Sequence, residues 1–202
     1  MKNDSKGNGM IKLMNNVMRL NGLAHAGAVV AAFAGLSFAK GRLDASYAAS
    51  RHPVDYVTGQ TGFSAELVKG YYAHMDALGT LDVYRVTQFV DFGFIVGVIC
   101  FAFCLSTFVG RFAKNGSWAC KIALFAGCAG MLGGLLDATE NLISFAMLAD
   151  PQGFANWIAI PYSAVAVGKF AAINIGMLGL LIAIVLMLSP AGKALWARLA
   201  GA

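Results

Sequence analysis

The sequence predicts an all-α polytopic membrane protein, a bundle of four transmembrane helices with a small helical cap on its outer side. Hydrophobic residues make up 58% of the 202-residue chain and charged residues only 12%, about half the charged share of a soluble domain. Four stretches are apolar over the ~20 residues that a spanning helix needs. Basic residues gather beside these stretches, as is typical of membrane proteins, and no basic stripe with interleaved aromatic residues points to nucleic acid.

We interpret the chain as one transmembrane domain over residues 1–202. The expected spans are residues 22–39, 86–110, 122–149 and 162–188. Ser189-Pro190 would end the last span. The first stretch could instead be a signal peptide, but no clean A-x-A cleavage site follows it. Residues 10–20 form a basic amphipathic pattern, which predicts an interfacial helix that anchors the chain, with lipid sensing as the alternative.

The basic residues also predict the orientation. The side with both termini carries Lys2, Lys6, Lys12, Arg19, Arg111, Lys114, Lys121, Lys193 and Arg198. The other side carries Lys40, Arg42, Arg51, Lys69 and Arg85, all in one long loop that also holds acidic residues. The positive-inside rule therefore places both termini in the cytoplasm of a multi-pass protein of the cell (inner) membrane.

The long loop, residues 40–85, is the predicted outer cap. Ser64 suits the N-cap of a helix, and Gly79 suits its C-terminal end. The apolar face expected for this helix comprises Leu67, Val68, Tyr71, Met75 and Leu78. A further helix should start near Thr80 and run unbroken into the second span.

The cysteines are expected to be free thiols. Cys100, Cys104, Cys120 and Cys128 fall in or beside the cytoplasmic half of the spans, and the outer loops contain none. Because that side of the membrane is reducing, no disulfide framework is predicted. No C-x-x-C pair is present, so we expect no metal site.

Ionisable residues inside the spans mark the candidate site. These are Asp91, Asp137, Glu140 and Lys169. Charge in hydrocarbon is costly, so each should face protein or water and have a partner. Counting ~1.5 Å per residue along each span brings Asp91, Asp137 and Lys169 to a similar depth. We predict that Lys169 pairs with Asp137 or Asp91.

Helical faces support this grouping. Asp137 and Asn141 continue a stripe of small residues formed by Gly130 and Gly134, and such stripes face neighbouring helices in lipid. Lys169 shares a face with Ala172, Gly176, Gly179 and Ala183. In the second span Tyr84, Gln88 and Asp91 align, with Arg85 just above them and in reach of the site.

The charges allow three interpretations of this site. Three acids face one lysine, so the site should exchange protons or bind a cation, whether or not Arg85 reaches down and reduces the charge imbalance. Ion pairs can also simply hold helices in register. Catalysis is the third interpretation, but Ser144 and Thr139 lie near no histidine of the spans. A zinc site from His74 with Asp76 or Glu140 is a weak possibility.

The chain resembles two groups of membrane proteins. The run from Gly134 to Leu142, with Asp137, Glu140 and Asn141, resembles the D-x-x-E-N signature of uncharacterised bacterial four-helix membrane proteins, which implies a compact helical bundle and no activity. The layout alone is similar to the class of sterol isomerases and the sigma-2 receptor, in which Asp91 would stand for the acid near the start of the second span.

The sequence therefore favours a small, non-catalytic membrane protein built around an outward-facing acidic site. It would act as a binding protein or as a subunit of a membrane complex, with a membrane-protein partner or a second copy of the chain as the partner. A proton-coupled carrier or intramembrane enzyme that uses the same residues is the alternative, and a sterol- or lipid-binding isomerase-like protein is another. Neither a ligand nor a cofactor is indicated by the residues themselves.

Overall fold

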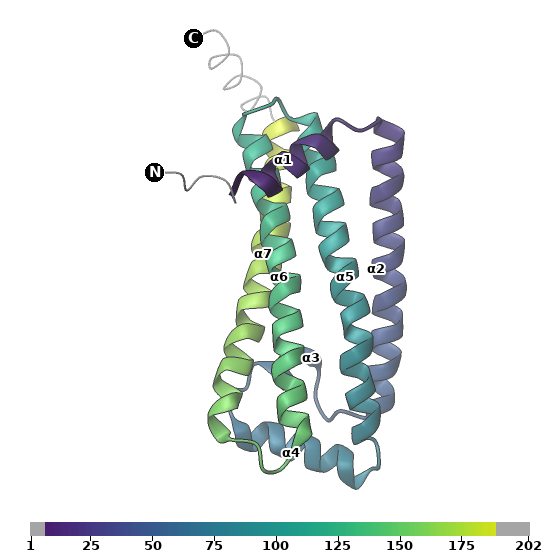
Figure 1. The fold of residues 1–202 in the computed structure, drawn as a ribbon, viewed down its shortest axis with the longest axis vertical. Helices are drawn as coiled ribbons and strands as arrows, with labels where there is room; N and C mark the ends of the chain where they lie inside the picture. The colour runs from purple at the N-terminus through teal and green to yellow at the C-terminus, as the bar shows by residue number, and fades with distance from the viewer. Residues whose placement is uncertain (1–6, 189–202) are drawn as a thin grey trace. The chain divides into compact units, whose positions relative to one another are not determined.

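The computed structural model describes residues 7–188. Its elements, in chain order, are α1 (Gly7–Met18), α2 (Gly22–Ser50), α3 (Tyr56–Gln60), α4 (Ala65–Ala77), α5 (Leu81–Phe112), α6 (Trp118–Ala149), the 3-10 helix η1 (Asn156–Ile158) and α7 (Ala159–Leu188) (Figure 1). This described part is helical, without strands. The expected stop at Ser189-Pro190 lies outside the described residues, as do Lys2, Lys6, Lys193 and Arg198 of the orientation argument.

Four helices of the described part, α2, α5, α6 and α7, are long and apolar enough to cross a membrane. The predicted fold class is therefore confirmed, and the chain is a multi-pass integral membrane protein. α5 and α6 each have 32 residues, more than the ~20 that a bilayer core requires. Parts of these helices therefore extend beyond the hydrocarbon.

The first long helix is longer than the predicted first span. It continues to Ser50, past Ala39, where the first span was predicted to end, so residues 40–50 of the predicted outer loop are helical. Two features favour a helix in this polar stretch. Leu43 is buried on one face, and Lys40 pairs with Asp44, four residues on, at 2.5 Å on the exposed face.

The helix ends next to the other connections agree more closely with the sequence-based prediction. α5 begins at Leu81 and runs unbroken to Phe112, as predicted. Gly79 adopts the left-handed conformation (φ +68°) that allows the turn before it. α1 ends at Met18, and the side chain of Asn21 then accepts the backbone N–H of Leu23 at 2.9 Å, which caps the start of α2.

The chain forms two compact units. Among the described residues, unit 1 comprises 7–33, 99–131 and 172–188, and unit 2 comprises 34–98 and 132–171. The four long helices each contribute one segment to both units, whereas α3, α4 and η1 belong to unit 2 alone.

Small residues let the helices of unit 1 approach closely. A Cβ atom added to Gly176 of α7 would lie 2.9 Å from the carbonyl oxygen of Ala126 and 3.1 Å from the amide nitrogen of Gly130, both on α6. Such close approach is how helices gain packing energy in lipid. Met14 of α1 is fully buried and reaches the position of Gly127, so α1 packs on this unit.

The core of unit 2 joins the cap to the long helices. It contains Ala65, Val68, Tyr72 and Met75 of α4, with Leu81 and Tyr84 of α5, Met147 and Leu148 of α6, Phe154, and Ala159 and Tyr162 of α7. Ser64 caps α4, as predicted, because its side chain accepts the N–H of Leu67. The predicted apolar face was partly wrong: Leu67 and Leu78 are exposed and Tyr72 is buried, because the true contact face is rotated toward Tyr72.

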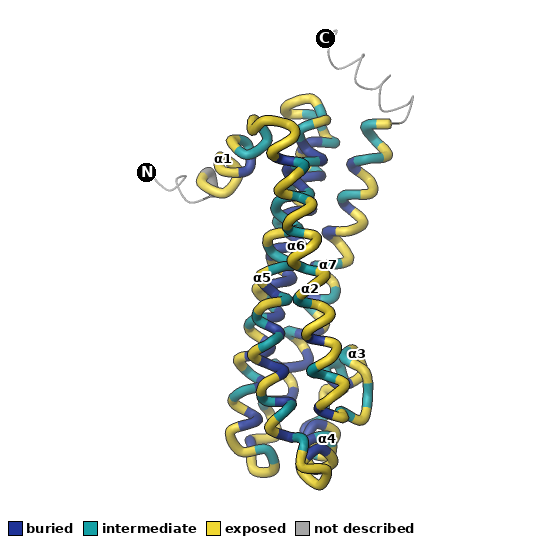
Figure 2. Tube along the Cα trace, turned by 90° about the vertical axis from the view of Figure 1, so that its right-hand side faces the viewer, coloured by how far each residue is buried: buried dark blue, intermediate teal, exposed yellow. Residues whose placement is uncertain are grey.

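Burial differs strongly among the long helices (Figure 2). Within the most apolar window of each helix, 6% of α2 is buried and 56% of α6. The exposed residues of α2 include Leu23, Val30, Phe33 and Phe38. An apolar surface of this kind is expected where a helix faces lipid.

Candidate functional site

The candidate site lies in unit 2 and is built by α5, α6 and α7. Tyr84, Gln88 and Asp91 are buried along one face of α5, since positions i, i+4 and i+7 share a face. On α6 the buried polar residues are Asp137, Glu140, Asn141 and Ser144, and on α7 they include Ser163 and Lys169. The structure thus buries seven of the eight site residues predicted from the sequence.

Lys169 is the centre of an ion-paired group. Its Nζ donates to Oδ1 of Asp137 at 2.7 Å and also to Oε2 of Glu140. Asp137 and Glu140 lie three residues apart on α6, so both carboxylates reach one ammonium group. All three side chains are at most 7% exposed. The predicted pairing with Asp137 is present, and Glu140 is a second partner that the prediction did not include.

Asp91 is held by an amide and not by Lys169. The side-chain amide of Asn141 donates to Oδ2 of Asp91 at 2.8 Å and to the backbone carbonyl of Gln88 at 3.5 Å. A carboxylate that accepts a hydrogen bond from a neutral amide still carries its full charge when ionised. Asp91 therefore has no cation in hydrogen-bond contact among the described residues.

Several buried oxygen atoms of this site lack a hydrogen-bond partner. They are Oη of Tyr72, Oε1 of Gln88, Oε1 of Glu140, Oδ1 of Asn141 and Oγ of Ser144. Unsatisfied buried polar atoms are rare and costly in native proteins. Their presence in one cluster gives the site unused hydrogen-bonding capacity.

Sequence reasoning missed the tyrosines that border the charged group. Tyr72 of α4 lies within reach of Ser144, and Tyr162 of α7 lies within reach of Glu140. Burial raises the pKa of Tyr72, so its phenol stays protonated and can donate a hydrogen bond. The amphipathic pattern of α4 could have identified Tyr72, but the predicted buried face contained Tyr71, one residue earlier, in its place.

Arg85 does not join the site, contrary to prediction. Its guanidinium donates to Oδ1 of Asp82 at 2.5 Å and to the backbone carbonyl of Leu148 at 3.0 Å. Both partners lie nearer to the cap-side ends of their helices than the charged group does, so the side chain extends away from it. Arg85 therefore adds no hydrogen-bonded cation to Asp91, Asp137 or Glu140.

The histidines also lie apart from the charged group. No cluster of three or more His, Cys, Asp or Glu residues in the described part could hold a metal ion, so the zinc site that includes His74 finds no support. His25 lies in unit 1, where it is fully buried and its Nε2 is 3.1 Å from Oγ1 of Thr107. Cys100, Cys104, Cys120 and Cys128 are free, as predicted.

His52 is enclosed by aromatic rings of α2, α4 and α5. Its ring centroid lies 5.2 Å from that of Tyr47, 5.1 Å from that of Tyr71 and 5.3 Å from that of Tyr84. Burial lowers the pKa of His52, and the nearby His74 adds to this effect, whereas Val54 and Asp55 oppose it. His52 is thus held neutral and serves the packing of the cap.

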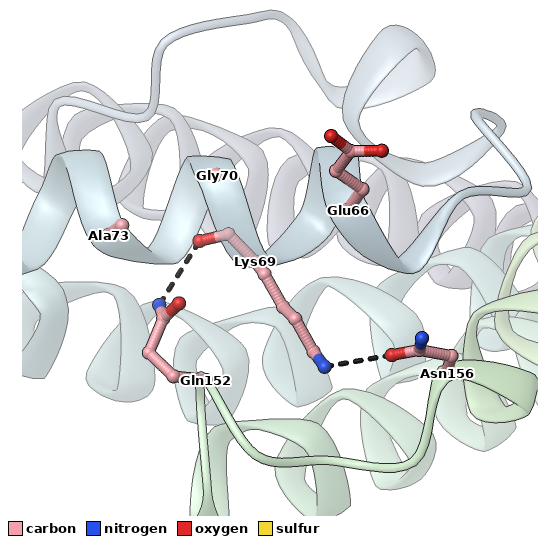
Figure 3. Close-up of a pocket in the computed structure, with 6 residues that line it drawn as sticks. All are labelled: Glu66, Lys69, Gly70, Ala73, Gln152 and Asn156. Carbon is pink, nitrogen blue, oxygen red and sulfur yellow. Dashed lines mark hydrogen bonds between the residues drawn. The ribbon is translucent and has the colours of Figure 1, made fainter.

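A surface pocket of about 490 Å³ lies elsewhere in unit 2, between α4 and the connection from α6 to α7. Its lining residues are Glu66, Lys69, Gly70, Ala73, Gln152 and Asn156. Lys69 reaches across it to donate to Asn156 at 2.8 Å, and Gln152 donates to the carbonyl of Lys69 (Figure 3). The pocket contains none of the buried charged residues.

Comparison with known proteins returned no match among family models, curated proteins or solved structures. The site itself therefore carries the information on function. Its chemistry consists of carboxylates, amide oxygens, hydroxyls and one ammonium group, all on helices of a membrane protein.

Proposed function

We propose that this protein is a non-catalytic membrane protein, acting as a binding protein or as a subunit of a membrane complex, whose working part is the buried acidic site around Lys169. In the proposed orientation both termini lie in the cytoplasm and the cap side faces outward, across the cell (inner) membrane. Membership of the bacterial four-helix group with the D-x-x-E-N motif is part of the same proposal.

The observation that carries the proposal is the excess of buried acid. Lys169 faces three buried carboxylates, those of Asp91, Asp137 and Glu140, so two negative charges have no protein cation when all three are ionised. A purely structural ion-pair network would gain from balanced charge, because an uncompensated buried charge costs several kcal/mol. The imbalance favours a site that takes up protons, a cation or a cationic group of a partner.

The geometry gives less support to catalysis. A nucleophilic serine requires a hydrogen-bonded general base, and the hydroxyl of Ser144 has no hydrogen-bond partner. Thr139, the other hydroxyl considered, donates to the carbonyl of Leu135 on its own helix. A proton-coupled carrier remains the alternative that uses the same acids, because carriers place ionisable groups within their spans.

Native mass spectrometry of the protein extracted in lipid nanodiscs tests the proposal. We expect the wild-type protein to carry a bound species, whether an ion, a lipid or a partner subunit, that is lost in Glu140→Gln. The matched control is Asp82→Asn, which removes an exposed carboxylate and should retain the bound species. Identical masses for wild type and Glu140→Gln, after subtraction of the substitution, would reject a binding role for the site.

A further inference from the structure

The buried oxygens near Asp91 suggest a specific ligand class. Oε1 of Gln88 and Oδ1 of Asn141 have no hydrogen-bond partner, and both residues are more than nine-tenths buried. The amide nitrogen of Asn141 already contacts Asp91 and the carbonyl of Gln88. These contacts bring the two residues and the carboxylate together where α5 meets α6.

The hydroxyl groups of the cluster lie on the side of Glu140. Glu140 when ionised, Gln88 and Asn141 each present an unpartnered oxygen that only accepts. The hydroxyl of Tyr162 lies within reach of Glu140, and the hydroxyls of Tyr72 and Ser144 supply one further hydrogen each, while the amide oxygens of Gln88 and Asn141 remain without a partner. Tyr72 and Ser144 also lie within reach of each other, on the side of α6 that carries Glu140. The amide oxygens beside Asp91 are thus the ones left for an added species.

Nearby protein cations do not fill this role. Lys169 donates to Asp137 and Glu140. Lys40 of α2 is close enough to interact electrostatically with the carboxylate of Asp91. Its ammonium, however, is paired with Asp44 at 2.5 Å and lies over the ring of Tyr56. Both lysines therefore form their ion pairs with carboxylates other than that of Asp91.

We propose that a small monovalent metal cation, with Na⁺ as the representative, binds beside Asp91 through the carboxylate of Asp91 and the amide oxygens of Gln88 and Asn141. Oxygen donors of this kind suit hard cations and not thiophilic metals. The donor set contains one carboxylate and two neutral amides, so its charge is matched by a single positive charge. Divalent Ca²⁺ is usually held by several carboxylates and carbonyls, and Asp91 is the sole carboxylate of this set.

This inference rests on the proposed function, because it assigns a ligand to part of the same acidic site. It names a ligand class and a donor set for the cation binding that the sequence left as one interpretation of the acidic site, and it departs from the expectation of no metal site that followed from the cysteines. The sequence alone showed Gln88 and Asn141 on different helices and could not show that their amide oxygens stay unpartnered.

Thermal unfolding of the detergent-purified protein tests the inference. NaCl is varied at constant ionic strength against N-methyl-D-glucamine chloride, whose cation is too large for a buried site. Ligand binding multiplies the folding equilibrium constant by 1 + [L]/Kd, so this constant should rise about tenfold for each tenfold increase of Na⁺ above the Kd. The midpoint temperature of wild type should rise accordingly.

Matched variants locate the effect. Asp91→Asn keeps the shape of the side chain and removes a buried charge, so it should fold, and its midpoint should not respond to Na⁺. Gln88→Met should lose most of the response, whereas Asp82→Asn, an exposed carboxylate of the same helix, should keep it. Equal midpoints of wild type in both salts at every pH between 5 and 8 would overturn the inference in favour of protons alone.

A response that survives in Asp91→Asn would also overturn the inference, because the cation would then bind elsewhere. Failure of the cation is distinguishable from failure of the whole site. Energetic coupling between Lys169 and Asp137 does not depend on Na⁺ at Asp91. If that coupling is intact and the midpoint does not respond to Na⁺, only the proposed cation site is rejected. The proposed function is then decided separately, by whether Glu140→Gln loses the bound species.

Discussion

The ammonium group of Lys169 on α7 lies 2.7 Å from a carboxylate oxygen of Asp137 on α6, and both side chains are almost fully buried. Glu140, three residues further along α6, contacts the same ammonium. One cation thus links two helices through two acids. The stability of unit 2 should depend on this pair.

We predict that Lys169→Met destabilises the protein by about 3–5 kcal/mol, because it leaves Asp137 and Glu140 buried without their cation. Asp137→Asn should partly restore stability in the Lys169→Met background, since it removes one unpaired charge and keeps a hydrogen-bonding shape. A double-mutant cycle read by thermal or denaturant unfolding measures the coupling. Strictly additive effects of the two substitutions would show that the pair does not act as a unit.

The close helix contact in unit 1 leads to a second prediction. Gly176→Ala places a Cβ atom 2.9 Å from the carbonyl oxygen of Ala126, and a backbone atom cannot move aside by itself. Overpacking of this kind costs about 1–3 kcal/mol. Gly93→Ala is the matched control, because a Cβ atom there meets no atom within 4 Å. Equal unfolding midpoints for the two variants would refute the close approach of α6 and α7.

The protonation of His52 predicts a pH dependence of stability. Burial lowers its pKa in the folded state from the usual 6.5, so the folded protein binds fewer protons at this residue than the unfolded chain. The stabilising contribution of neutral His52 is therefore complete above pH 6.5 and declines as the pH falls below that value.

The corresponding measurement compares unfolding midpoints at pH 7.5 and pH 5. His52→Phe keeps an aromatic ring between Tyr47 and Tyr84 and should show a smaller loss on acidification than wild type. His74→Gln, a change at an exposed histidine, should keep most of the wild-type slope. A slope that is unchanged in His52→Phe would mean that other groups set the acid sensitivity.

The proposed orientation predicts which residues can be labelled from outside the cell. In a background with all four cysteines replaced by alanine, a single cysteine at Glu66, in α4 of the cap, should react with a membrane-impermeant thiol reagent. A single cysteine at Asn115, between α5 and α6, should react only after permeabilisation. Both residues are exposed, so accessibility differs only by side. The reverse pattern would invert the topology.

Local pattern alone determined the class of this protein and most of its helices. Twenty or more apolar residues in succession must be helical in lipid, because no water is present to satisfy the backbone. The same logic identified Asp91, Asp137, Glu140 and Lys169, since charge within an apolar stretch stands out in any sequence. Ser64 as a helix cap and Gly79 as a turn residue are likewise local signals, and the structure contains both features.

Only the tertiary structure decided how these residues combine. Sequence counting placed the acids at similar depth, but the choice of Asp137 and Glu140 over Asp91 as partners of Lys169 depends on helix rotation. Rotation is set by packing between helices, and a turn of about 100° per residue moves a side chain to another neighbour. The same reason explains why Arg85 reaches Leu148 and not the site, and why the unpartnered amide oxygens of Gln88 and Asn141 became visible only in the folded protein.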